Sequence, residues 1–336
     1  MSDVVLSVQD VSIVYHADRG DVKASNHISF DLHKGEAIAL IGESGSGKTT
    51  VSLSFVDMLP KVAEITGGKV LFTNGKGETS NILEYSHEQM RDLRWKECAM
   101  VFQGSQSSFN PVLRIKEQFL DTARAHGWNN KEEVLAKSVE LLKFVRLDPQ
   151  RTLESYPHEL SGGMKQRTLI ALGVLLSPPV VIFDEPTTAL DIITQRAIID
   201  VLKEMQEKLG FSIIFISHDL ALAAELSTRV ATMYAGAIVE LGPVEDIFYK
   251  ALHPYTLGLL RSVPRLSQTN EELSSIKGNP PDLINPPSGC KFHPRCEFAS
   301  EKCAIEEPLL IEYEDNHSAA CWHTDKVVEA RKGLWD

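Results

Sequence analysis

The chain has 336 residues, of which 43% are hydrophobic and 24% charged, the balance of a globular protein and not of a disordered one. Its 34 Lys and Arg against 46 Asp and Glu give a formal net charge of −12, which argues against a nucleic-acid partner. Because the sequence has neither an apolar run long enough to span a membrane nor a secretory signal, we expect a soluble intracellular chain whose five cysteines are not disulfide-bonded.

The first part of the chain carries strand patterns and then a buried strand. Alternating apolar residues predict strands over residues 6–15 and 28–32. The continuous apolar run 37–41 predicts a strand buried on both faces. A glycine-rich turn follows, with a helix from near Lys48, and residues 86–89 fit a capping box that opens a short helix.

The middle of the chain alternates helices with buried strands. Two amphipathic helices are expected on either side of residues 127–130, and a further helix over residues 164–176. Buried strands are expected over residues 180–183 and 212–216, separated by a helix over residues 194–209 that ends at Gly210. This alternation predicts an α/β class with a parallel sheet. The domains expected are 1–245, with a helical insert over about 105–165, and a small irregular Cys-rich domain, 246–336.

A phosphate-binding motif spans residues 42–49, GESGSGKT, which match G-x-x-x-x-G-K-[ST]. Its glycines let the backbone aim N–H groups at an anion, and the helix that follows adds a partial positive charge. The lysine would reach the β- and γ-phosphates of ATP and the Thr49 hydroxyl would bind Mg²⁺. The alternative is a glycine-rich turn with a stray lysine. The residues of this segment expected at ATP are Gly42, Ser44, Gly45, Gly47, Lys48, Thr49 and Thr50.

Two acids follow the buried strand that ends near residue 183. The carboxyl end of a central strand opens into the crevice where α/β sheets bind ligands. Asp184 can hold Mg²⁺ through water, and Glu185 can polarise the attacking water. The alternative is that the strand ends at the surface and the two acidic side chains are only solvated.

A second candidate anion site is the segment 160–167, LSGGMKQR, where Ser161, Gly162 and Gly163 open a helix. The alternative is an ordinary helix start with a serine cap. Together with the phosphate motif, this segment resembles the ATP-binding cassette (ABC) family of P-loop NTPases. The resemblance implies two subunits stacked head-to-tail, with ATP between the P-loop of one chain and the signature segment of the other.

The family pattern can be carried over to further single residues. Gln103 matches the loop glutamine that senses Mg²⁺ and water and faces the transmembrane subunit. Asp191 matches the aspartate that contacts the partner's site, and His218 matches the switch histidine at the γ-phosphate. Tyr15 matches the aromatic residue that stacks on adenine. With Glu185, His218 and the signature segment all present, the resemblance implies a competent hydrolysis site, with Glu185, His218 and Gln103 as its catalytic residues.

Four of the five cysteines are clustered near the C-terminus, at spacings C-x5-C-x6-C-x17-C. They can hold a metal, although zinc usually takes closely paired cysteines. An iron–sulfur cluster tolerates more varied spacing, and four incidental thiols are the remaining alternative. Cys98 lies apart and is expected to be a small buried hydrophobe. The clustered residues are Cys290, Cys296, Cys303 and Cys321.

Four further segments resemble the ATPases of oligopeptide and dipeptide importers, which narrows the family resemblance. They are residues 107–111, 253–256, 278–283 and 289–296. In that group the four cysteines are associated with a [4Fe-4S] cluster. The group also includes nickel importers.

The resemblance implies an ATP-hydrolysing subunit at the cytoplasmic face of the membrane that powers di- or oligopeptide uptake. Its expected partners are a related ATPase subunit in a heterodimer, two transmembrane permeases and an extracytoplasmic peptide-binding protein. The alternatives are an importer of nickel or another small solute, and a non-transport ABC ATPase that acts on ribosomes or DNA. The single cassette, the lack of a long heptad run and the acidic charge argue against the last.

Overall fold

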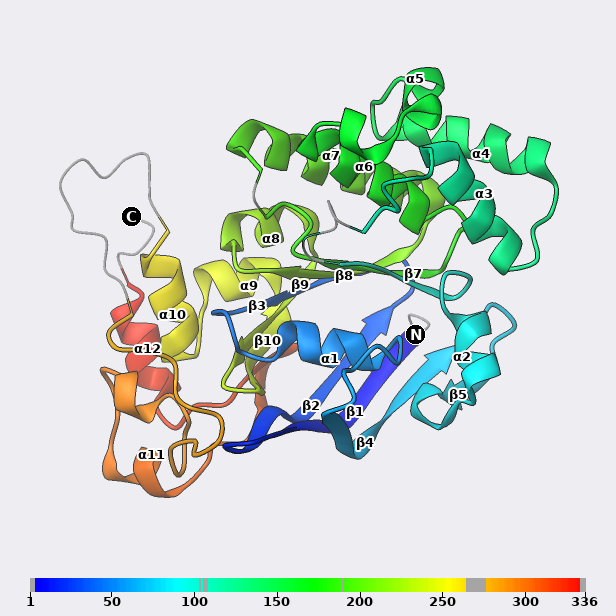
Figure 1. Ribbon diagram of the computed structural model, residues 1–336. Helices are drawn as coiled ribbons and strands as arrows, with labels where there is room; N and C mark the ends of the chain where they lie inside the picture. The colour runs from blue at the N-terminus through cyan, green and yellow to red at the C-terminus, as the bar shows by residue number, and fades with distance from the viewer. Residues whose placement is uncertain (1–3, 103, 105–107, 189, 264–275, 333–336) are drawn as a thin grey trace. The chain divides into compact units, whose positions relative to one another are not determined.

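The computed structural model describes residues 4–102, 104, 108–188, 190–263 and 276–332, and the chain divides into two compact units (Figure 1). Unit 1 consists of residues 1–6, 32–36 and 72–215, and unit 2 consists of residues 7–31, 37–71 and 216–336. No helix of the described part is both long and apolar enough to cross a bilayer.

Unit 1 combines strands with a group of helices. The helices α3, α4, α5 and α6 pack against one another and form the green group in Figure 1. In the sheet, β8, β7 and β6 are neighbours in that order, and β6 pairs in parallel with β7. The elements are β5 (Thr79–Asn81), η1 (Ile82–Glu84), α2 (His87–Leu93), β6 (Cys98–Val101), α3 (Ile115–Ala125), α4 (Lys131–Phe144), α5 (Pro149–Glu154), η3 (Pro157–Glu159), α6 (Gly162–Gly173), β7 (Val180–Asp184), α7 (Ile192–Leu209) and β8 (Ser212–Ser217).

Unit 2 contains strands of two sheets. In one, β2, β1 and β4 are neighbours in that order, and in the other the order is β11, β12, β10, β9, β3. The elements are β1 (Val4–Ala17), β2 (Gly20–His33), β3 (Ala37–Ile41), α1 (Lys48–Ser54), β4 (Ala63–Thr73), α8 (Leu220–Leu226), β9 (Arg229–Tyr234), β10 (Ala237–Pro243), α9 (Val244–Tyr249), α10 (Pro254–Arg261), η4 (His293–Arg295), α11 (Glu301–Ile305), β11 (Ile311–Glu314), β12 (His317–Ala319) and α12 (Thr324–Ala330).

Most of the expected elements are present near the expected residues. The buried strand over residues 37–41 is β3, all of whose residues are at most 1% exposed. The capping box at Ser86 has both of its hydrogen bonds, and Gly210 ends α7 in the left-handed conformation. The two amphipathic helices are α3 and α4.

The helix expected over residues 164–176 was wrong at both ends. It runs from Gly162 to Gly173, because the Ser161 side chain caps it and both glycines of the signature segment are helical. A Cβ on Gly173 would lie 2.9 Å from Val101 Cγ2, so the helix passes very close to β6 at its C-terminal end.

The residues after 245 contribute to the sheet of unit 2, which the sequence did not indicate. β12 pairs with β10 through Glu240 opposite Ala319 and Leu241 opposite Ser318. Glu240 and His317 are both fully buried and lie 2.8 Å apart. The carboxylate of Glu240 also accepts the backbone N–H groups of Leu252 and His253. The domain boundary near residue 245 and a separate Cys-rich domain remain predictions.

Candidate functional site

The phosphate loop of unit 2 follows β3 and depends on glycine at two crowded positions. Gly42 has φ +148° and Gly47 has φ +101°, conformations that side chains disfavour. A Cβ on Gly42 would lie 2.2 Å from the Met233 carbonyl oxygen, and one on Gly47 would lie 2.3 Å from that of Ala24. The backbone of β9 and β2 therefore fixes the path of the loop.

Lys48 begins α1 and is folded back over this loop. Its Nζ donates to the carbonyl oxygens of Gly42 and Glu43, at 2.7 and 3.0 Å, and lies 3.4 Å from Ser46 Oγ. The side chain is buried, so its charge is held among acceptors instead of being solvated. Phosphate oxygens are stronger acceptors than carbonyl groups for such an ammonium group.

Tyr15 and His218, both in unit 2, come from elements distant in sequence from the loop. The Tyr15 hydroxyl lies 3.2 Å from Thr50 Oγ1, so β1 brings the ring to the first turn of α1. His218 is exposed between β8 and α8, at the carboxyl end of the strand. Asp219 then caps α8 by accepting the backbone N–H of Ala221.

The two acids of unit 1 differ in their surroundings. Asp184 is the last residue of β7 and is 1% exposed. Glu185 is half-buried and has φ +45°, a left-handed conformation that costs a non-glycine residue about 1–2 kcal/mol. The Thr188 hydroxyl donates to its carboxylate at 2.8 Å. The turn thus holds the Glu185 side chain at the carboxyl end of the strand.

The signature segment and the start of α7 lie together in unit 1. A Cβ on Gly163 would be 3.0 Å from Thr194 Cγ2. Asp191 caps α7 by accepting the Thr194 N–H at 3.0 Å and the Thr194 hydroxyl at 2.7 Å, and these bonds lower the pKa of Asp191. Beside this cap, Ile192 and Ile193 are each 82% exposed.

The structure therefore groups the expected residues within each unit. Unit 2 brings Tyr15 to the phosphate loop, and unit 1 brings the signature glycines to the Asp191 cap. Gln103 lies outside the described residues.

The four clustered cysteines all belong to unit 2 and are partly or fully buried. The pKa of Cys296 is raised to about 11 and that of Cys321 to about 12, mainly by burial and to a lesser extent by charge on the neighbouring cysteines. The Cys290 N–H donates to the Cys303 carbonyl oxygen at 2.8 Å. Within the described ranges, no three His, Cys, Asp or Glu side chains are grouped to hold a metal ion.

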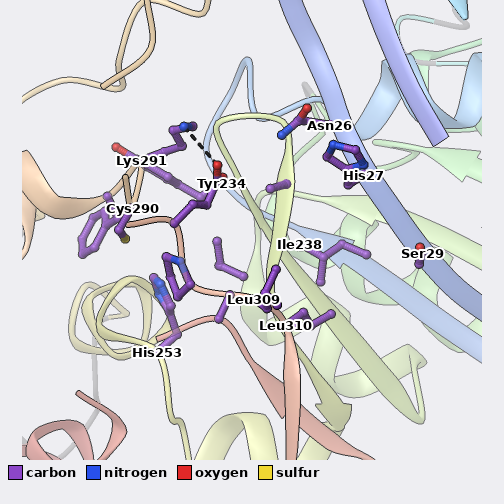
Figure 2. Close-up of a pocket in the computed structure, with 16 residues that line it drawn as sticks. Asn26, His27, Ser29, Tyr234, Ile238, His253, Cys290, Lys291, Leu309 and Leu310 are labelled. Atoms are coloured by element: carbon purple, nitrogen blue, oxygen red, sulfur yellow. Dashed lines mark hydrogen bonds and ion pairs between the residues drawn. The ribbon is translucent and has the colours of Figure 1, made fainter. Parts of the chain in front are cut away.

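A cavity of about 490 Å³ adjoins the cysteine segment within unit 2. Figure 2 shows Tyr234 and Cys290 on one side of it and Asn26 and His27 on another. Its lining includes no residue of the phosphate loop.

Sequence reasoning missed the residues that contact Glu43 of the phosphate loop. Arg295 makes two hydrogen bonds to the Glu43 carboxylate, at 2.7 and 2.9 Å, and the Tyr255 hydroxyl accepts the Glu43 N–H at 2.7 Å. Both residues lie in segments that resemble peptide-importer ATPases, but nothing local in those segments points to the loop.

Comparison with known proteins decides the family. Residues 25–188 match the ABC transporter family, and residues 239–303 match the oligopeptide/dipeptide transporter C-terminal region. The dipeptide transport ATP-binding protein DppD of Caldanaerobacter subterraneus is 44% identical over 320 residues, covering 95% of this chain and 96% of the relative. This chain is an ABC transporter ATP-binding subunit of the oligopeptide/dipeptide type.

Other ABC proteins agree with this assignment. DppD of Bacillus subtilis is 40% identical, with 97% of this chain and 96% of the relative covered. Among solved structures, the ABC MJ0796 bound to ADP and phosphate is 25% identical with a TM-score of 0.62, covering 71% of this chain and 98% of that one. The cbiO1 subunit of Clostridium perfringens is 26% identical with a TM-score of 0.62, covering 74% and 92%. The α/β ABC ATPase fold expected from the sequence is confirmed.

Proposed function

We propose that this ATPase subunit binds ATP between its own phosphate loop and the signature segment of a second subunit. The observation that carries the proposal is that one chain has two loop–helix junctions suited to phosphate, at Lys48 in unit 2 and at Ser161 in unit 1. Each junction offers only one set of donors, and the family resemblance assigns the second set around the triphosphate to the partner subunit.

In this proposal the phosphates of the nucleotide replace the carbonyl oxygens as hydrogen-bond acceptors for Lys48. The Lys48 ammonium group then donates to the β- and γ-phosphates instead of the carbonyl oxygens of Gly42 and Glu43. Tyr15 stacks on the adenine. The partner's signature segment supplies the helix N-terminus that faces the γ-phosphate, and Asp191 lies against the partner's site.

Hydrolysis is assigned to the acids of unit 1 and to two residues known from the resemblance. Glu185 accepts a proton from the attacking water, and His218 donates to the γ-phosphate. Gln103 positions the same water. Asp184, which is 1% exposed, would hold Mg²⁺ through water, and the resemblance assigns Thr49 and Gln103 to the same ion. Mg²⁺ would neutralise the phosphate charge when bound.

Substitution of Glu185 tests this assignment. We expect Glu185→Gln to bind ATP normally but to reduce steady-state hydrolysis by the assembled complex at least about a hundredfold, because the amide cannot accept the proton. Glu207→Gln, an exposed position on α7, is the matched control and should hydrolyse ATP at the wild-type rate. Near-normal turnover by Glu185→Gln would refute the role.

The transported substrate and the partners follow from the family. We propose that ATP binding closes a heterodimer with a related ATPase subunit and that hydrolysis reopens it, because ATP favours the closed state. The movement would pass through two transmembrane permeases at the cytoplasmic face of the membrane to release a di- or oligopeptide from an extracytoplasmic binding protein.

The similarity to dipeptide transport ATP-binding proteins favours a peptide over nickel or another solute as the cargo. Co-purification of the tagged chain with membrane proteins would support import. Co-purification with ribosomes would instead support the non-transport alternative.

We also propose that Cys290, Cys296, Cys303 and Cys321 hold a [4Fe-4S] cluster. Three of the four are connected in the structure, because the Cys290 N–H donates to the Cys303 carbonyl oxygen at 2.8 Å and Cys290 and Cys296 pack against the same hydrophobic cluster. Within the described residues no three His, Cys, Asp or Glu side chains are grouped to hold a metal ion, so the resemblance carries this proposal. Bound iron would take the cysteines as thiolates and offset the cost of burying their charge.

A further inference from the structure

The second residue of the phosphate loop, Glu43, is held from three directions by side chains of unit 2. Its N–H donates to the Tyr255 hydroxyl at 2.7 Å, and its carbonyl oxygen accepts from Lys48 at 3.0 Å. Its carboxylate receives two hydrogen bonds from Arg295, at 2.7 and 2.9 Å. The backbone and the side chain of Glu43 are therefore both fixed.

Arg295 is buried and fully engaged at this position. Its side chain is 6% exposed, compared with 27% for the Glu43 side chain. Its Nε donates to the Lys277 carbonyl oxygen at 2.9 Å, and a second guanidinium nitrogen donates to the Tyr234 hydroxyl at 3.3 Å. Bidentate pairs between a guanidinium and a carboxylate are directional, so this contact sets an orientation as well as a distance.

An aromatic cluster connects the pair to the cysteine segment. Tyr234, Tyr255 and Phe292 pack with ring centroids 4.7 to 5.5 Å apart, and Cys290 and Cys296 pack against the cluster. The guanidinium of Arg295 lies 5.7 Å from the Tyr234 ring centroid and 5.9 Å from that of Phe292. Any shift of this segment must therefore move the group that holds Glu43.

We propose that Arg295 is a positioning residue through which the C-terminal cysteine segment sets the shape of the phosphate loop and hence the affinity for ATP. The proposal rests on the proposed function, since it requires the loop to bind ATP. In this proposal Arg295 acts through Glu43, whose backbone lies within the loop between Gly42 and Lys48. The effect falls on binding, because the loop shape matters equally for the bound substrate and the transition state.

The test uses the full-length chain for ATP binding and the assembled importer for kinetics. We expect Arg295→Gln to raise both the Kd and the KM for ATP about tenfold, equivalent to about 1.4 kcal/mol, with kcat within about twofold of wild type. Arg295→Lys keeps the charge but loses the bidentate geometry, so its affinity for ATP should lie between those of wild type and Arg295→Gln. Hydrogen exchange of the Glu43 amide should accelerate in Arg295→Gln.

A double-substitution cycle shows whether the pair acts as a unit. Glu43→Gln should weaken ATP binding in the same direction, and Glu43→Gln with Arg295→Gln should bind no more weakly than Arg295→Gln alone. The matched control is Arg261→Gln, which removes an arginine of the C-terminal part whose hydrogen bonds to Glu297 and Ala330 do not involve Glu43 or Arg295. It should leave ATP affinity at the wild-type value.

The outcomes separate this proposal from the function on which it rests. Wild-type affinity and wild-type exchange in Arg295→Gln would overturn the positioning role while leaving ATP binding intact. Failure of the wild-type chain to bind ATP, or unchanged binding by Lys48→Ala, would overturn the proposed function instead. If Arg295→Gln does not fold, Glu43→Gln decides, because it leaves the Arg295 bonds to backbone in place, and unchanged affinity there refutes the proposal.

Discussion

The phosphate loop and the C-terminal part of unit 2 reach their structures by different means. The loop has a local signature in its glycines with positive φ angles, although the backbone neighbours that exclude a side chain there, Met233 and Ala24, are distant in sequence. The C-terminal part has short helices and strands, and its order depends on contacts to residues far away in sequence. The contacts of Glu240 with His317 and of Glu43 with Arg295 are of this kind. Local geometry can therefore be recognised as a motif, whereas long-range pairing cannot.

The largest effect, on ATP affinity, is expected at a crowded glycine of the phosphate loop. Gly47→Ala places a Cβ 2.3 Å from the Ala24 carbonyl oxygen at a residue with φ +101°, so the loop must move. We expect ATP affinity to fall at least about a hundredfold, equivalent to about 2.7 kcal/mol, by fluorescence titration. Gly67→Ala is the control, since nothing lies within 4 Å of its Cβ position and its φ is not positive. Wild-type affinity in Gly47→Ala would show that the loop is not fixed by its neighbours.

An intermediate effect is expected in the C-terminal part. Glu240→Ala leaves the N–H groups of Leu252 and His253 and the ring of His317 without their buried acceptor. We expect a loss of about 3 kcal/mol or more in the free energy of unfolding, measured by chemical denaturation.

The exposed Glu329→Gln, which disturbs only a surface pair with Lys332, should change stability by less than about 0.5 kcal/mol. Equal stability of the two variants would mean that the residues after 245 fold without this link. That result would favour the domain boundary predicted there.

Among the substitutions at buried positions, the smallest effect on stability is expected at Cys98, which lies apart from the other cysteines. Cys98→Ala removes one buried sulfur from β6 and should cost about 1 kcal/mol with no change in bound iron. Because burial raises the pKa of Cys98 to about 12, its thiol should also resist alkylation at pH 8 in the native chain.

The contrasting variant is Cys321→Ser. Iron and sulfide analysis of anaerobically prepared protein should show the wild-type content in Cys98→Ala and a clear loss in Cys321→Ser. Iron-free wild-type protein, or equal iron in both variants, would exclude the proposed cluster ligands.

The sequence predicted what depends on neighbouring residues. The buried strand β3, the capping box at Ser86 and the end of α7 at Gly210 all follow from short patterns. The start of α6 was missed by two residues because glycine pairs usually mark turns, whereas the Ser161 cap makes this pair helical.

Other features could not be predicted because they join distant residues. The pairing of β12 with β10 and the contact of Arg295 with Glu43, 252 residues away, have no local signature. The residues expected at the nucleotide include both predictable and unpredictable features. The glycines and Lys48 are recognisable by spacing, but the contact between Tyr15 and Thr50 depends on how β1 packs against α1.

The exposed isoleucines at the start of α7 bear on how the free chain behaves. Ile192 and Ile193 are each 82% exposed, so water must solvate two adjacent branched hydrocarbon side chains. Any surface that buried them would gain free energy. Purified without its companions, the polypeptide should therefore self-associate as its concentration rises, and light scattering should fall when both positions are changed to threonine.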